Sequence, residues 1–288
     1  ESATFAQRMH SSTLAPSSHQ LLSTLHLANI NENGGLKMPE RTLYTLIEIG
    51  CSDWDTLDET EIDLHPYGFL ISFEPVLEKY AVLLARGTAR FRGKQLDMAV
   101  PLGHHHHRGV VLPLAVSPAG GVANFTVHTR AGCSSLLKAN QSATATWGKL
   151  CRDVLEMRRI ETISIVQAVN LSGSLPIRHL KIDAQGMDFK LIKALEHERP
   201  GLLRARVASV QLETRTSQCV PLYEGQETCD EVLAFMTALG YSSKHHCPLA
   251  KTWCERTMQF FDPFFKSYQL AKTSATHQMF RKFRQVNT

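Results

Sequence analysis

The sequence predicts an α/β protein with a doubly wound, mostly parallel sheet, and two observations carry this prediction. From about residue 39, short apolar runs that end at glycine or at an acidic residue alternate with stretches of helical periodicity. Strands that alternate with helices in this way pair in parallel and are joined by right-handed crossovers. The composition, with 43% hydrophobic and 20% charged residues, is that of an ordinary globular chain and excludes a wholly disordered or fibrous one.

Seven short apolar runs are the predicted strands, because each has the length of a buried strand and stops at a turn residue or a charged residue. They cover residues 43–49, 68–73, 110–116, 123–129, 159–166, 179–183 and 207–212.

Two predicted helices lie between these strands. From Leu77 to Leu84, apolar residues recur at the spacing of one helix face, and Gly87 is expected to end that helix. A second helix carries apolar residues from Leu191 to Leu195 and is expected to end at the following Arg-Pro-Gly run.

A third helix is predicted from the capping box of Thr228 with Glu231, and Gly240 is expected to close it. The segment after it is aromatic, with Phe260 and Phe261 among its residues, and is expected to pack over the sheet.

The domain organisation follows from the same change of pattern. Residues 1–37 are rich in Ser, Thr and Asn and are predicted to be a flexible N-terminal extension or arm. Residues 38–266 form the predicted domain, and residues 267–288 form a C-terminal tail.

The charge and the hydropathy exclude two kinds of partner. The net charge of +4 is too small to argue for nucleic-acid binding. No apolar run approaches the roughly 20 residues that a membrane span needs. The sequence therefore predicts neither a nucleic-acid partner nor a membrane span.

The seven cysteines are spread out, and no two of them form a CxxC motif. An odd number at irregular spacing argues against a disulfide framework and against a zinc finger. Most of these cysteines are therefore expected to be reduced thiols in the core.

Three glycosylation sequons point in the other direction. They begin at Asn124, Asn140 and Asn170, and so include three of the seven asparagines. Sequons matter only in a chain that enters the secretory pathway. Because the chain also begins without Met, the compartment is left open between the cytoplasm and a secretory or organellar location.

Polar clusters follow three of the predicted strands. They are Glu48 to Asp53, then Glu74 with Pro75, and then Asp183 to Gly186. In an open parallel sheet, ligands bind beyond the carboxyl ends of the strands, where the strand order reverses. An acid at the end of the second strand is suited to the two hydroxyls of a ribose, so a cofactor that contains a nucleoside is expected.

The first loop favours a cationic cofactor. A dinucleotide would need a GxGxxG motif, but Gly50 stands alone and the next glycine is Gly68. Six acidic residues lie between Asp53 and Asp63 and would repel a pyrophosphate, whereas S-adenosylmethionine carries a sulfonium and an ammonium. The alternative for the later four acids is a solvated helix face.

These elements together resemble the FkbM-type methyltransferases, a branch of the class I S-adenosylmethionine-dependent enzymes with a Rossmann-like fold. The resemblance covers roughly residues 40–245, in the family's order. The segments that carry it are LIEIG at 46–50, SFEP at 72–75, PLAVS at 113–117 with Gly120-Gly121, LKIDAQG at 180–186, VQLE at 210–213 and the stretch from Tyr223 to Tyr241.

The resemblance implies a cofactor role for several residues. Glu48 and Gly50 would border the methionine part of S-adenosylmethionine, with Cys51 and Ser52 beside them. Glu74, followed by Pro75, would hold the ribose hydroxyls, and Ala115 would line the adenine slot. Asp183 would face the amino group of the cofactor or the acceptor, and Gln185 with Gly186 would shape the turn. No metal is implied.

The sequence departs from the family pattern at two positions. Trp54 stands where a second glycine is common, so the first loop must take another path or place its indole near the cofactor. Asp188 stands where a glutamate is common, which is a minor change.

Methyl transfer to a hydroxyl requires alignment of the reacting atoms and a base that takes the proton. Asp183 is the first candidate for this base and Glu213 the second, although a strand-end acid in a salt bridge explains Glu213 equally well. His179 lies within a strand, where a core histidine is the more natural interpretation. The run His104 to His107 is expected to be a surface loop, because adjacent side chains cannot all point the same way.

The predicted function is therefore methylation of a hydroxyl on a sugar, a glycan or a small metabolite. Two alternatives remain open. The chain could be a methyltransferase-fold binding module without turnover, which the departure at Trp54 motivates, or a nicotinamide-dependent oxidoreductase, against which the lone Gly50 argues.

Overall fold

The computed structural model describes residues 30–52, 57–84, 90–91, 94–95, 108–143, 150–247 and 254–263. Several features of the sequence analysis lie outside these described residues: the predicted N-terminal extension up to residue 29, Asp53, Trp54 and Asp55, the expected helix end at Gly87, the run His104 to His107, and the predicted tail 267–288.

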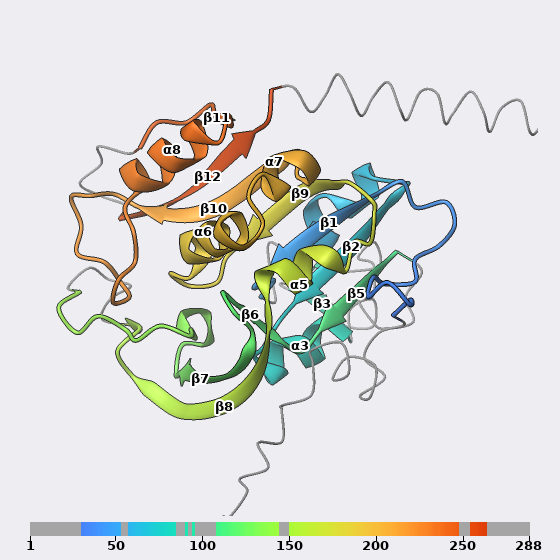
Figure 1. The fold of residues 1–288 in the computed structure, drawn as a ribbon. Coiled ribbons are helices and arrows are strands. Elements are labelled where there is room, and N and C mark those ends of the chain that lie inside the picture. Colours follow the sequence, from blue (N-terminus) through green and yellow to red (C-terminus); the bar gives the residue numbers. More distant parts are fainter. Residues whose placement is uncertain are drawn as a thin grey trace, which may run out of the picture.

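A seven-stranded, mostly parallel sheet forms the centre of a mixed α/β fold (Figure 1). The strand order is β11-β12-β10-β9-β1-β2-β5. The five strands β5, β2, β1, β9 and β10 pair in parallel, whereas β12 runs antiparallel to β10 and β11. Their bounds are β1 Tyr44–Ile49, β2 Gly68–Phe73, β5 Gly109–Leu112, β9 Ile177–Ile182, β10 Ser209–Arg215, β11 Ser242–Ser243 and β12 Glu255–Phe261.

Helical segments pack on both faces of this sheet. On one face, Leu46 and Leu70 of the sheet belong to a buried cluster with side chains of α2 (Leu57–Thr60), the 3-10 helix η1 (Ile62–Leu64) and α3 (Leu77–Leu84). On the other face, Ile47 and Ile71 belong to the main core. The helices that contribute to this core are α5 Ile165–Asn170, α6 Asp188–Glu198, α7 Leu202–Arg206 and α8 Cys229–Ala238.

A second sheet of three strands lies beside the first, at the bottom of Figure 1. It consists of β6 Ala115–Ser117, β7 Gly121–His128 and β8 Val154–Ser164, in the order β6-β8-β7. The short strands β3 Arg90–Phe91 and β4 Lys94–Gln95 form a separate pair. A 3-10 helix, η2 Ala131–Cys133, follows β7.

The prediction of one strand over residues 110–116 was wrong, because β5 ends at Leu112 and β6 begins at Ala115 in the other sheet. Pro113 stands between them. Proline has no backbone N–H to donate to a neighbouring strand, so it interrupts the ladder and lets the chain change sheets.

The strand predicted over residues 159–166 was also misplaced. It begins earlier, at Val154, and ends at Ser164. There the Ser164 hydroxyl accepts a hydrogen bond from the Gln167 N–H, and the Gln167 side chain accepts from the Ser164 N–H. This capping box starts α5, and its Ser-x-x-Gln pattern was visible in the sequence.

The C-terminal part of the sheet differs from the prediction as well. Instead of ending at Glu213, β10 continues to Arg215, because β12 pairs with it along its whole length. The aromatic segment with Phe260 does not simply cover the sheet. It provides β12, and Phe260 is buried opposite Val210. The capping box at Thr228 and the helix end at Gly240 are confirmed.

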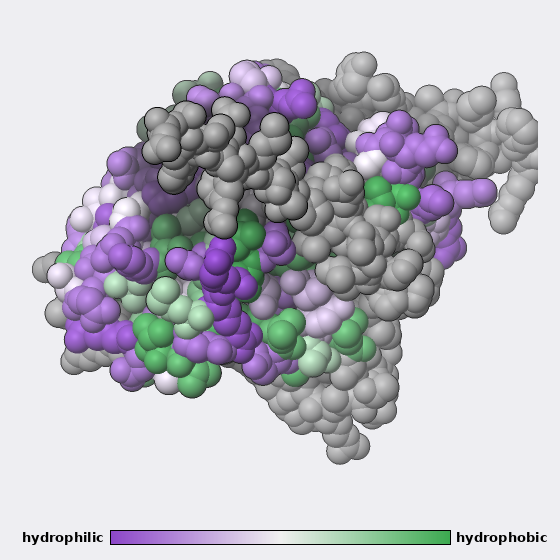
Figure 2. Space-filling view, turned by 60° about the horizontal axis from the view of Figure 1, so that its bottom comes forward, coloured by the Kyte–Doolittle hydropathy of each residue, from purple (hydrophilic) through white to green (hydrophobic). Residues whose placement is uncertain are grey.

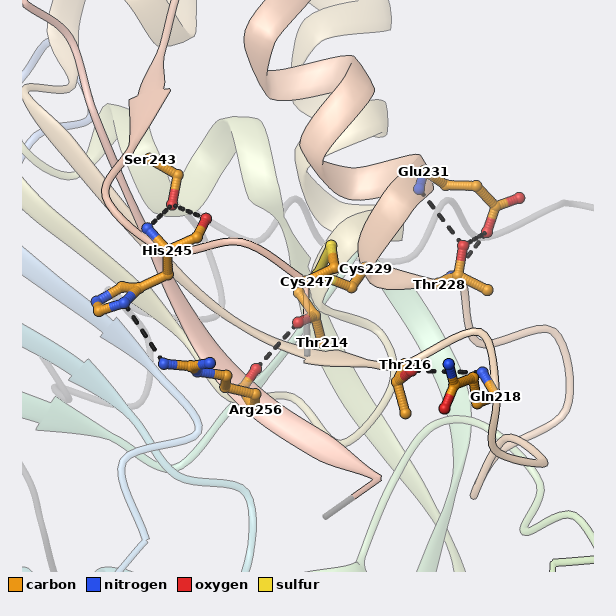
Figure 3. Close-up of a disulfide and its surroundings, with 10 residues drawn as sticks. All are labelled: Thr214, Thr216, Gln218, Thr228, Cys229, Glu231, Ser243, His245, Cys247 and Arg256. Carbon is orange, nitrogen blue, oxygen red and sulfur yellow. Dashed lines mark hydrogen bonds between the residues drawn. A yellow bond between two sulfur atoms is a disulfide. The ribbon is translucent and has the colours of Figure 1, made fainter. Parts of the chain in front are cut away.

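The expectation of reduced core cysteines was wrong for six of the seven residues. They form the disulfides Cys133–Cys151, Cys219–Cys254 and Cys229–Cys247, whereas Cys51 is buried and belongs to no disulfide. Spacing along the chain does not report these pairs, because each one joins different elements of the fold. Cys229–Cys247, for example, ties the first residue of α8 to the segment after β11 (Figure 3).

Among the described residues, no helix has the length and apolar character to cross a membrane.

Candidate functional site

The strand order reverses beside β1. From β1 the chain proceeds through β2 to β5 on one side, and it then returns to place β9 and β10 on the other side. The carboxyl ends of β1 and β9 are therefore neighbours, and the Asp183 N–H donates a hydrogen bond to the Ile49 carbonyl across this switch point at 2.9 Å. Open parallel sheets bind their ligands at this position.

The turn after β1 lies unusually close to the turn after β9. Gly50 has a φ of +76°, and a Cβ placed on it would lie 2.0 Å from the Asp183 carbonyl oxygen. No other residue fits this position without moving the backbone. The N–H groups of Gly50 and Cys51 both donate to the Phe73 carbonyl. The turn after β1 therefore also lies against the end of β2, the strand on the other side of β1.

Glu74 and Ser52 lie together at the end of β2. The two Glu74 carboxylate oxygens accept hydrogen bonds from the backbone N–H groups of Ser52 and Val76, both at 2.8 Å. The Lys79 ammonium in α3 donates to the Ser52 hydroxyl at 2.8 Å. The carboxylate of Glu74 is buried, with 3% of the residue exposed, and these backbone bonds define its orientation. Pro75, between these contacts, is half-buried.

Glu48 is engaged inside the protein. Its carboxylate lies 3.0 Å from the Lys181 ammonium of β9, accepts from the Leu57 N–H at the start of α2, and is 3.4 Å from the Ser72 hydroxyl of β2. Full burial raises the pKa of Glu48 to about 7, although Lys181 opposes the increase. Glu48, Ser72 and Lys181 are at one register position on three adjacent strands.

A network of hydrogen bonds supports Asp183. The Gln185 side-chain amide donates to a carboxylate oxygen of Asp183 at 2.7 Å. Gln185 has a φ of +51°, and its side-chain carbonyl accepts from the Tyr223 hydroxyl at 2.9 Å. The Ser135 hydroxyl donates to the Gln185 backbone carbonyl at 2.7 Å. The same Tyr223 hydroxyl donates a hydrogen bond to the Cys133 carbonyl at 3.0 Å. The segment that follows β7 of the second sheet is therefore linked to this edge as well.

In the sequence, Asp188 is a minor departure from the family pattern. In the structure, its side chain holds two strands of the site together. Its carboxylate accepts from the N–H groups of Ala184 and of Glu213, both at 3.2 Å, and thereby ties the end of β9 to β10. Burial, followed by the charge of Asp183, raises the pKa of Asp188 well above its ordinary value. The available sequence signal was an acid in the first turn of a helix, where the helix dipole favours it.

The remaining predicted residues are placed as follows. Glu213 is half-buried in β10, one residue beyond the Leu212–Ile182 pair that joins β10 to β9, and so lies beside the β9 end. Ala115 is buried in β6 and pairs with Thr162 of β8, three residues after β5 ends. His179 is within β9, where its ring nitrogen is 2.8 Å from the Ser209 hydroxyl and burial lowers its pKa to about 4.

Of the acids after Gly50, the structure describes the side chains of Asp58 and Glu61, and these two differ in exposure. Asp58 of α2 is buried with 1% exposure, whereas Glu61 pairs with His65 at 3.4 Å and is partly exposed. Within the described part of the chain, no group of three His, Cys, Asp or Glu side chains is arranged to hold a metal ion.

No protein-family model matches the chain, and no curated protein sequence matches it. A solved structure with some similarity is the crystal structure of the small RNA methyltransferase HEN1, at 11% sequence identity and a TM-score of 0.33. The similarity covers 90% of this chain but 27% of that one, so this chain spans about a quarter of its length. A likeness this distant carries no argument about activity.

The raised pKa of Glu48 predicts a specific pH dependence of stability. In the unfolded chain this carboxyl ionises near its ordinary value of 4.5, whereas in the folded protein it keeps its proton up to about 7. Its contribution to the free energy of unfolding is therefore complete below pH 4.5 and is lost as the pH rises to 7, by about 3 kcal/mol.

Urea unfolding of the wild type and of Glu48→Gln between pH 4 and pH 8 measures this effect. The difference in unfolding free energy between the two proteins should change by that amount across the window. Glu198→Gln, at an exposed position at the end of α6, is the control and should run parallel to the wild type. Parallel curves for Glu48→Gln would contradict the buried, raised-pKa carboxyl.

Proposed function

We propose that this protein is an S-adenosylmethionine-dependent methyltransferase that acts on a hydroxyl of a sugar, a glycan or a small metabolite. The observation that carries the proposal is the meeting of three turns at the switch point, each with an acidic residue: Glu48 before Gly50, Glu74, and Asp183. The resemblance to FkbM-type methyltransferases supports the same activity, and the mostly parallel sheet is compatible with a methyltransferase-like fold.

The residues at this edge fit S-adenosylmethionine chemically. Glu74 is a buried carboxylate at the end of the second strand, held by two backbone N–H groups, which suits the two hydroxyl donors of a ribose. Asp183 directly follows β9, and Glu213 lies within β10, one residue beyond its last pair with β9; their negative charge favours a cofactor with an ammonium and a sulfonium. The buried cation Lys181 is paired with Glu48.

Each residue then has a defined task in the proposal. Glu74 binds the ribose, and the Gly50 turn with Cys51 and Ser52 borders the methionine part. Ala115 lines the adenine site. Asp183 takes the proton of the acceptor hydroxyl, or binds the cofactor's amino group, and Gln185 orients it. When bound, S-adenosylmethionine supplies an electrophilic methyl group, so the protein mainly aligns the acceptor and excludes water.

The binding-module alternative shares this cofactor site and differs only in turnover. The oxidoreductase alternative is disfavoured by the first turn. Gly50 is the single glycine between β1 and β2, apart from the first residue of β2, so the motif that binds a pyrophosphate at a helix N-terminus is missing.

The role of Glu74 predicts a loss of cofactor binding. In Glu74→Ala, the affinity for S-adenosylmethionine and for S-adenosylhomocysteine should fall about 100-fold, which corresponds to about 2.7 kcal/mol for the lost charged hydrogen bonds. Isothermal titration measures both ligands, and a thermal melt of each variant verifies folding. Glu78→Ala, four residues later with a side chain that is 71% exposed, is the matched control and should bind like the wild type. Unchanged binding to a folded Glu74→Ala variant would contradict the proposed ribose contact.

The role of Asp183 is tested by Asp183→Asn, which keeps an oxygen for the Gln185 amide but removes the base. Initial rates of S-adenosylhomocysteine formation are measured with a panel of monosaccharides and small alcohols, together with cofactor affinity. A rate reduced by at least about 100-fold with unchanged affinity identifies the base. A reduced affinity identifies the contact to the cofactor's amino group.

Asp230→Asn, at an exposed position of α8, is the control and should change neither quantity. If Asp183→Asn also changes neither, both proposed roles of Asp183 are wrong. If the wild type binds the cofactor but shows no turnover with any acceptor of the panel, the binding-module alternative is favoured.

A further inference from the structure

We propose that Asn124 and Asn140 carry N-linked glycans, and that the protein is therefore made in the secretory pathway. Two independent observations meet in this proposal. The chain has sequons at both positions, and its structure contains three disulfides. Disulfides persist in oxidising compartments and are rare in the cytosol, and the same secretory route attaches glycans to Asn-x-Ser/Thr.

Asn124 lies on the outer face of the second sheet. Its neighbours in β7, Phe125 and Val127, face inward and are buried in a small cluster with Val76. Because side chains alternate along a strand, Asn124 and Thr126 share the opposite face, and Asn124 is exposed there. Both chemically required members of the sequon are thus presented on one side of the strand.

This outer face also exposes several apolar side chains, which a glycan would cover. Across the sheet, Thr126 is paired with Met157 and Asn124 with the exposed Arg159. Met157 is 66% exposed, Leu155 is 64% exposed and Val122 is 48% exposed. Figure 2 brings this side of the molecule forward and shows apolar residues among hydrophilic ones at the surface. A hydrophilic glycan on Asn124 would stand among these apolar side chains and cover them.

Asn140 lies in a turn within the loop that the Cys133–Cys151 disulfide closes. Its backbone is anchored, because the Asn140 N–H donates to the Leu222 carbonyl at 2.7 Å. Its side-chain carbonyl accepts from the Ser142 N–H at 2.9 Å, and Ser142 is exposed. Asn140 itself is half-buried, and the turn places the hydroxyl-bearing Ser142 at the surface, whereas the corresponding Ser172 of the third sequon is buried.

Asn170 differs from both. It is the last residue of α5, and the Ser172 hydroxyl of its sequon is buried against Thr45 at 2.9 Å. The chain around Leu36 lies directly over this turn, since the Leu36 N–H donates to the Leu171 carbonyl. The hydroxyl that this sequon needs is therefore buried inside the fold, so we assign no glycan to Asn170.

The modification itself balances as a group transfer. The side-chain nitrogen Nδ2 forms a bond to the anomeric carbon of an oligosaccharide. The bond from that carbon to a phosphate oxygen of a lipid-linked diphosphate donor breaks, the lipid diphosphate leaves, and the amide proton passes to a base of the transferring enzyme.

The test uses the protein isolated from the cells that produce it. Peptide N-glycosidase in heavy-oxygen water converts each glycosylated Asn into a labelled Asp, and mass spectrometry of peptides locates the label. Asn124 and Asn140 should be labelled and Asn170 should not. Alkylation of the denatured protein before reduction should modify one thiol, that of Cys51, and leave the other six cysteines in three linked peptides. An unlabelled Asn124 or Asn140, or alkylation of the six, would overturn the proposal.

Matched variants expressed in the same cells separate the two sites. Thr126→Ala and Ser142→Ala keep the asparagines but remove the hydroxyl that the sequon needs, so each should lower the intact mass by one glycan. Asn170→Gln should leave the glycan mass unchanged. A glycan lost in Asn170→Gln, or retained in both hydroxyl variants, would show that the assignment of sites is wrong.

Discussion

The candidate site depends on the contact between the Gly50 turn and the backbone of Asp183. The two turns end the two strands between which the strand order reverses, and only a glycine fits where a Cβ would meet the Asp183 carbonyl oxygen at 2.0 Å. This contact brings Glu74 and Asp183 to one edge, because the Gly50 N–H also donates to the end of β2. The family resemblance implies that Gly50 borders the cofactor, and the structure adds that this glycine also lies against the protein's own backbone.

Beneath that edge, buried acids hold the strand ends together. Glu48 connects β1 to β9 through Lys181 and to the start of α2 through the Leu57 N–H, and Asp188 connects the end of β9 to β10. Buried polar groups of this kind stabilise only when all their hydrogen-bond partners are present, so these two carboxyl groups define the relative positions of the strands. A polar residue such as Glu48, which the sequence suggests as a ligand contact, can therefore hold the strands of the site in place.

The sequence was sufficient for the elements whose signals are local. Gly68–Phe73 as a strand and the helix capped by Thr228 follow from apolar runs and capping residues, and both are observed. The sequence was insufficient for features that depend on contacts between residues far apart in the chain. β12 forms because its residues pair with the edge of β10. The six cysteines form disulfides with residues that only the fold brings close. Asp188 links two strands only because the Glu213 N–H lies beside it. At Pro113 and Ser164, local signals for a break were present and outweighed by the apolar character around them.

We propose that the cofactor lies at the edge formed by the ends of β1, β2 and β9. Hydrogen–deuterium exchange with and without saturating S-adenosylhomocysteine tests it most directly. Bound ligand should slow exchange in residues 49–52, 73–76 and 183–187, where the backbone N–H groups of Ser52, Val76 and Asp183 are hydrogen-bonded around the switch point. Slower exchange confined to other segments, such as β7 and β8, or no change at saturation, would contradict it.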